Sequence, residues 1–90
     1  MHQILDISVA INAIRAAFRP LICVVQVYDY EKRIRFRVLG PNKKPVLTVV
    51  GISMRDAVDP VRLLDEIQNA RTRVAAKGFE LTSWVPPRAG

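Results

Sequence analysis

The strictest pattern in this chain is the alternation of basic and apolar residues at positions 32–39. The apolar members are Ile34, Phe36 and Val38, and the basic members between them are Arg33, Arg35 and Arg37. Successive side chains of a strand point to opposite faces of a sheet, so this period of two predicts a strand with one apolar face and one arginine face. The apolar face must then be covered by other elements, and the opposite face is left for water or a ligand.

Two further strands are predicted on either side of this one. Residues 21–30 are rich in β-branched and aromatic side chains and contain neither Gly nor Pro. Residues 45–52 are also apolar, and Pro45 suits the first position of a strand. Gly40-Pro41-Asn42 predicts the turn between the second and third strands. Because consecutive strands joined by short connections usually pair, we expect an antiparallel meander.

Helical spacing occurs at both ends of the chain. Within residues 4–18, one face is formed by Ile7, Ile11, Ile14 and Phe18. A second helix is predicted between Asp59-Pro60, a favourable start, and Gly78, a favourable end. Its apolar face consists of Leu63, Ile67, Ala70 and Val74. The Ser53-x-x-Asp56 spacing predicts one short helical turn before it.

These elements predict an α+β fold for residues 1–90 as a single domain. The order is α-β-β-β-α, and the simplest packing places both helices on one face of the three-stranded meander, in two layers. Residues 79–90 are either a short fourth strand or an extended tail, and Pro86-Pro87 stops any strand there.

The net charge of +6 is confined to one stretch. Residues 32–44 contain no acid, and their six basic residues are Lys32, Arg33, Arg35, Arg37, Lys43 and Lys44. Outside the stretch, 14 − 6 = 8 basic residues balance 8 acidic ones. A concentrated patch of this kind makes a local field that attracts anions.

The predicted strands place this charge on the sheet face remote from the helices. The candidate nucleic-acid-binding residues are Arg33, Arg35, Arg37, Lys43, Lys44, Tyr28 and Tyr30. Alternate residues of a strand stand about 6.5–7 Å apart, which is close to the spacing of successive phosphates in a nucleic-acid strand. Arginine binds phosphate through a fork of donors, and tyrosine stacks on bases. The pattern therefore predicts a surface for RNA or single strands.

Two other interpretations of the same face remain open. An antiparallel sheet often leaves one polar face in water, and edge charges block aggregation. The second interpretation is a protein–protein module, either a homodimer or an adaptor or inhibitor of an acidic partner. Its candidate contacts are Val46 and Val50, expected to point outward, and Trp84, which either covers the core edge or anchors a partner.

Motifs for catalysis, metal binding or cofactor binding are not found. His2 stands alone, Cys23 has no second cysteine, and the four scattered glycines form no phosphate-binding loop. We expect no enzymatic activity, no metal site and no cofactor. Cys23 lies in an apolar run, so it is expected to be a buried thiol. Without a signal peptide or a membrane-length apolar run, a cytoplasmic protein is expected.

The α-β-β-β-α order resembles the double-stranded RNA-binding domain in topology, but Gly40-Pro41 lies in the wrong turn and no His follows. No binding residues are therefore assigned from that domain. A second resemblance rests on Phe18-Arg19-Pro20-Leu21-Ile22-Cys23, on Leu47-Thr48-Val49-Val50-Gly51-Ile52-Ser53 and on Arg62-Leu63-Leu64. These segments resemble a family of short proteobacterial proteins of unknown function (domain of unknown function 1652). The resemblance covers roughly residues 4–76 and implies a small bacterial cytoplasmic protein with no known activity.

Overall fold

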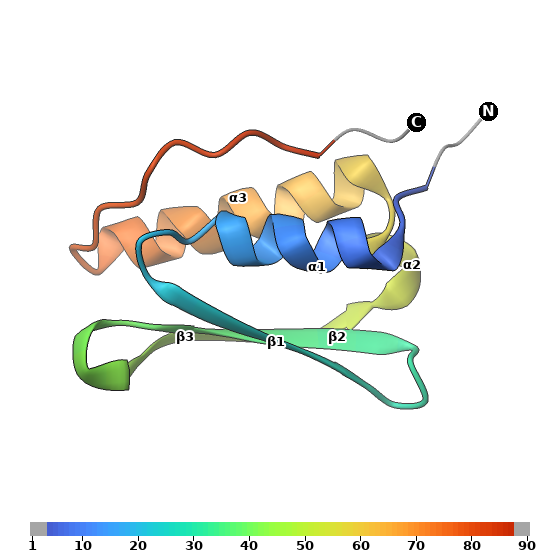
Figure 1. Cartoon of the computed structure of the whole chain (residues 1–90), viewed down its shortest axis with the longest axis horizontal. Coiled ribbons are helices and arrows are strands. Elements are labelled where there is room, and N and C mark those ends of the chain that lie inside the picture. Colours follow the sequence, from blue (N-terminus) through green and yellow to red (C-terminus); the bar gives the residue numbers. More distant parts are fainter. Residues whose placement is uncertain (1–3, 88–90) are drawn as a thin grey trace.

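Two long helices lie on the same face of a three-stranded antiparallel sheet (Figure 1). The computed structural model describes residues 4–87. Its elements are α1 (Ile7–Ala16), β1 (Ile22–Tyr28), β2 (Arg33–Leu39), the 3-10 helix η1 (Pro41–Lys43), β3 (Pro45–Ser53), α2 (Met54–Ala57) and α3 (Pro60–Ala76). The strand order is β1-β2-β3, so β2 is central. The predicted two-layer α+β fold is confirmed.

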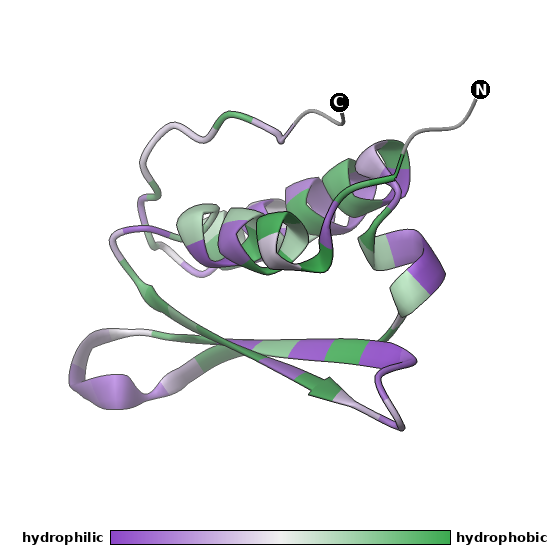
Figure 2. Cartoon of the chain, turned by 45° about the vertical axis from the view of Figure 1, so that its right-hand side comes forward, coloured by the Kyte–Doolittle hydropathy of each residue, from purple (hydrophilic) through white to green (hydrophobic). Residues whose placement is uncertain are grey.

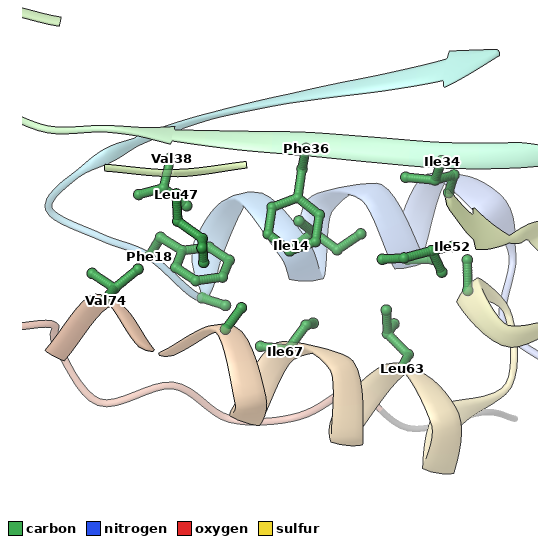
Figure 3. Packing of buried hydrophobic residues seen from close by; sticks show 14 of the residues in the cluster. Ile14, Phe18, Ile34, Phe36, Val38, Leu47, Ile52, Leu63, Ile67 and Val74 are labelled. Carbon is green, nitrogen blue, oxygen red and sulfur yellow. The ribbon is translucent and has the colours of Figure 1, made fainter. Parts of the chain in front are cut away.

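The core lies between the helix layer and the sheet. The three apolar residues of β2 point toward the helices and are fully buried (Figure 3). The rings of Phe18 and Phe36 meet there, with their centroids 5.4 Å apart. Aromatic pairs at this separation add to the free energy that burial of their area already provides. The inner face of β2 thus supplies the centre of the core, as the alternating pattern predicts.

Helix α3 follows its sequence signals closely. The Asp59 carboxylate accepts hydrogen bonds from the backbone N–H groups of Val61 and Arg62, at 3.0 and 3.4 Å. Pro60 occupies the first turn, and Gly78 follows the helix with a φ of 93°, a conformation that favours glycine. The predicted apolar face is buried. The Ser53-x-x-Asp56 turn is also confirmed, because Ser53 Oγ accepts from the Asp56 N–H at 3.2 Å.

Helix α1 buries a different stripe from the one predicted. Its buried residues are Ala10 and Ile14, followed by Ala17 and Phe18 just beyond its end. Ile11 is only half-buried, and Ile7 is 37% exposed. Ala10 and Ala17 stand four residues before and three residues after Ile14, so they share its face, and the buried stripe is rotated toward them. The prediction that Ile7 faces the core is therefore wrong.

Strand β3 contains two β-bulges, which change the direction of its side chains. Val38 pairs with Leu47, but the next residue of β2 pairs with Pro45, so Val46 is an extra residue. Val46 and Leu47 are consequently both buried, and Val46 is only 8% exposed. The prediction that Val46 points outward is wrong, because a bulge breaks the alternation of faces. The second bulge includes Gly51, whose φ of 83° lies in the left-handed region.

The C-terminal segment is an extended tail, not a fourth strand. Residues 79–87 cross the helices on the side away from the sheet (Figure 1). The Thr82 N–H donates to the carbonyl of Arg19 at 2.9 Å, and Arg71 Nη2 donates to the carbonyl of Thr82 at 3.1 Å. The last part of the predicted tail, residues 88–90, lies outside the described residues, as does His2.

Candidate nucleic-acid interface

The three arginines of β2 project together from the sheet face that no helix covers, here called the outer face. Their exposures alternate with the buried Ile34, Phe36 and Val38 along the strand. Figure 2 shows the same alternation as successive polar and apolar bands on β2. The predicted orientation of Arg33, Arg35 and Arg37 is therefore confirmed. It follows from one local rule, the period of two in a strand that has no bulge of its own.

The register of the sheet decides which residues flank each arginine. Arg37 pairs with Val24 of β1 and Thr48 of β3. Arg35 pairs with Gln26, and Arg33 pairs with Tyr28. A shallow pocket of about 130 Å³ opens between the cross-strand neighbours of Arg37 and those of Arg35. It is lined in part by Val24, Gln26, Arg35, Arg37 and Thr48. The centre of the outer face thus combines guanidinium groups with small polar and apolar side chains.

Arg35 is held in place by two neighbours. Its Nε donates a hydrogen bond of 2.6 Å to the amide oxygen of Gln26. Its guanidinium carbon lies 5.2 Å from the ring centroid of Tyr28, a cation–π distance. A guanidinium has five N–H donors in a planar fork, so the bond to Gln26 leaves most of them for a ligand. Arg35 is accordingly oriented before any anion arrives, which lowers the entropy lost on binding.

The other two arginines differ in how their charge is balanced. Arg33 Nε lies 3.2 Å from a carboxylate oxygen of Asp29, in an ion pair that is about half exposed on both sides. Exposed pairs of this kind contribute little to stability, but they neutralise charge locally. Arg37 makes no ion pair within residues 4–87. Of the three arginines, Arg35 and Arg37 therefore offer their charge to a ligand most directly.

The two predicted tyrosines occupy different places. Tyr28 is half-buried at the end of β1, on the outer face beside Arg35. Tyr30 is 94% exposed in the turn between β1 and β2. The prediction of a strand through residue 30 is wrong, because residues 29–31 all have positive φ values, between 53° and 66°. Tyr30 therefore lies at one end of the face and not on it.

The two predicted lysines lie at the opposite end of β2 from Tyr30. Lys43 ends η1 and Lys44 follows it directly, and both side chains are exposed. The predicted basic residues consequently form a line about as long as β2, with Lys43 and Lys44 at one end and Arg33 near the other. Such a line of basic residues fits an extended, phosphate-bearing ligand that runs along β2 better than it fits a compact anion.

The three candidate protein-contact residues are not brought together. Val46 is in the core, and Val50 is 64% exposed on β3. Trp84 is half-buried against α1, where its Nε1 donates to the carbonyl of Ala13 at 3.1 Å. Trp84 thus covers the helix layer on the far side from the sheet. No single surface contains Val46, Val50 and Trp84.

Two residues of the candidate interface were missed in the sequence. Gln26 orients Arg35, and Asp29 neutralises Arg33. Both partnerships depend on the pairing of β1 with β2, and the length of the connecting turn sets that pairing. The turn has four residues, 29–32, and this length places Tyr28 opposite Arg33. A tight turn around Glu31 is expected between the first two strands, but its sequence contains neither Gly nor Asn, so no signal fixes its length.

Cys23 is half-buried in β1. Burial raises the pKa of the Cys23 thiol to about 12, although the nearby Arg15 lowers it in part. The thiol is therefore protonated near neutral pH and unreactive as a nucleophile. No three His, Cys, Asp or Glu side chains within residues 4–87 are grouped so that they could hold a metal ion. Likewise, none of the helices in this part of the chain has the length and apolarity needed to cross a membrane.

The fold and the outer face define a small α+β protein that exposes three arginines of its central strand on one face of its sheet. No family model, curated protein or solved structure matches the chain. The resemblance to the family of short proteobacterial proteins stays a prediction.

Proposed function

We propose that this protein is a non-enzymatic regulatory module that binds single-stranded nucleic acid, and RNA in particular, on the outer face of its sheet. The observation that carries the proposal is the joint, uncovered projection of Arg33, Arg35 and Arg37. A strand spaces them about 6.5–7 Å apart, so neighbouring guanidinium groups match successive phosphates of one backbone.

The roles of the side chains follow from their places on the face. Arg35 and Arg37 bind two successive phosphates, with Arg35 held in place by Gln26. Lys43 and Lys44 extend the contact along the backbone beyond the end of β2. Tyr28 stacks on one base from its place beside Arg35 at the end of β1.

The shape of the face favours a single strand over a duplex. Major-groove recognition requires an element that protrudes into the groove, such as a helix or a two-stranded ribbon. Here the three arginines lie on a sheet, where splayed bases can lie against the surface as on other sheet-based RNA-binding modules. A cytoplasmic location belongs to the same proposal, because RNA is plentiful there and the lone Cys23 thiol stays reduced.

The proposal is tested by the affinity of the protein for a fluorescein-labelled 12-nucleotide RNA, measured by anisotropy at several salt concentrations. Each phosphate contact to a single strand contributes a slope of about 0.7 in log affinity against log salt. The affinity carried by four or five contacts therefore falls by about 50- to 130-fold when the salt is raised from 50 to 200 mM. Labelled DNA of the same length, duplex RNA and heparin are measured in parallel.

A matched pair of double variants locates the site. Arg35→Gln/Arg37→Gln should weaken RNA binding by about 25-fold at 0.1 M salt and lower the slope by about 1.4. Arg62→Gln/Arg73→Gln removes the same charge from exposed positions on α3 and should change the affinity less than about threefold. Equal losses in the two variants, or no RNA binding by the parent at 50 mM salt, would refute the proposal. Heparin binding as tight as RNA binding would refute its RNA preference.

A further inference from the structure

The first strand leaves an open edge on the sheet. β1 pairs with β2 over all seven of its residues without a register shift, and β2 separates it from β3. Within residues 4–87, the backbone of Ile22–Tyr28 makes no hydrogen bond to any element other than β2. Its second side is therefore a row of unpaired N–H and C=O groups, the kind of edge that pairs with another strand.

The two edges of the sheet differ in how they are protected. β3 begins with a proline and contains two bulges, one of them at Gly51. These features interrupt strand pairing. β1 contains no proline, no glycine and no charged residue, and its exposed apolar side chains are Ile22, Val24 and Val27. An edge this long, regular and apolar is one that soluble proteins normally cover.

Helix α1 presents unused apolar surface along the same edge. α1 packs mainly on β1, whereas α3 packs on β3. The flank of α1 that holds Val9 and Ala13 lies beside the tail. The opposite flank contains Ile7, Ile11 and Arg15 at four-residue spacing, and Arg15 is close enough to Cys23 to influence the thiol. Ile7 and Ile11, the two residues of the predicted helix face that are not buried, thus lie beside the unpaired edge of β1.

We propose that β1 pairs edge to edge and antiparallel with β1 of a second copy of this chain, about a two-fold axis near Val25 that is perpendicular to the sheet. With this axis both helix layers stay on one side, so the pairing extends the sheet to six strands and brings the two Ile7–Ile11 flanks together. The proposal does not rest on the nucleic-acid function.

Charge favours a second copy on this edge over one on the outer face. Because β1 has no charged side chain, self-pairing places no like charges opposite each other: Val24 of one copy lies across from Gln26 of the other, and Cys23 from Val27. The two β2 strands are then three strand spacings apart, about 14 Å, which exceeds the screening length of about 8 Å at physiological salt. Face-to-face pairing would instead press the arginines of both copies together.

The consequence for the outer face is that dimerisation enlarges it and does not cover it. Two sets of Arg33, Arg35 and Arg37 would lie on one continuous face of the six-stranded sheet, with the helices of both copies behind it. A dimer and a nucleic-acid complex are therefore compatible in this arrangement.

The mass of the protein in solution tests the proposal. Sedimentation equilibrium from micromolar to millimolar concentration should show a concentration-dependent rise from the chain mass of 10.1 kDa to twice that value. Val27→Lys puts a charge at the open edge, on the helix side, and should weaken the dimer at least about 100-fold because both copies carry the unpaired charge. Val50→Lys is the matched control on β3, at a position that is more exposed than Val27, and it should remain dimeric.

A second variant keeps the test decisive if Val27→Lys fails to fold by circular dichroism. Ile7→Lys lies on the exposed flank of α1, outside the buried core, and should also give the monomer mass. A parent that stays at 10.1 kDa throughout overturns the proposal, as does a dimer that only Val50→Lys disrupts. Arg35→Gln/Arg37→Gln should lose RNA binding and keep the dimer mass, so failure of the nucleic-acid function and failure of edge pairing are told apart.

Discussion

Removal of the Asp29 carboxylate should strengthen nucleic-acid binding, which few substitutions do. Asp29 holds Arg33 through an exposed ion pair of 3.2 Å, so part of the charge of the outer face is neutralised before any ligand binds. Asp29→Asn removes the negative charge and releases the guanidinium. Asn also tolerates the φ of 57° at this position, because its short polar side chain is often found in the left-handed region.

The size of the effect follows from one additional phosphate contact. Such a contact raises the slope of log affinity against log salt by about 0.7, so the gain in affinity of the variant over the parent should be about fivefold greater at 0.1 M than at 1 M salt. The lost ion pair is exposed, so the free energy of unfolding should fall by no more than about 1 kcal/mol. Affinity should therefore rise while stability stays nearly constant.

The assay is anisotropy with the labelled 12-nucleotide RNA at 0.1, 0.2 and 0.4 M salt. Asp65→Asn is the control, since it adds the same charge at an exposed position on α3, in the layer behind the sheet. It should leave the slope unchanged. An Asp29→Asn protein with the parent's affinity and slope would show that Arg33 takes no part in binding and that the reasoning from the outer face is wrong.

Three other predictions concern the stacking residue, the core and the half-buried thiol of Cys23. Tyr28→Leu should weaken RNA binding by about 1–3 kcal/mol, seen by anisotropy, whereas Tyr30→Leu at the end of the face should have a smaller effect. Phe36→Ala should lower the free energy of unfolding in urea by about 3–5 kcal/mol, because the ring is fully buried, and a loss below 1 kcal/mol would contradict the core described above. The folded state keeps the Cys23 thiol protonated up to a pKa of about 12, and the unfolded state loses the proton near the ordinary value of 9.0. The unfolded state therefore binds fewer protons between these values, so stability should fall as the pH rises from 9 toward 12, and Cys23→Ala should make this fall shallower.

Several features of the fold were predictable because their signals are local. The strand β2 follows from the alternation of Arg33 to Val38, and α3 follows from a capping Asp, a first-turn proline and a terminal glycine. Each pattern depends only on residues close together in the chain, because the backbone geometry of a strand or of a helix end fixes where those side chains point. The outward direction of Arg33, Arg35 and Arg37 followed from the same period of two.

Other features depended on partners distant in the chain. The direction of Val46 is set by a bulge in β3 opposite the end of β2, and Lys77 Nζ donates to the Val46 carbonyl from the end of α3. The position of Trp84 depends on the Ala13 carbonyl, across 71 residues of sequence. In each case a local pattern was ambiguous, and a contact from a remote element selected one outcome.

The arginine side of β2 was thus already specified by the order of residues 32–39, because a strand has only two faces and its neighbours alternate between them. The order of these residues does not determine that the arginine side stays uncovered. Its exposure depends on both long helices packing on the other face and on the tail crossing those helices instead of the sheet. The open edge of β1 is likewise a property of the assembled sheet, since an edge exists only once the strand order is set.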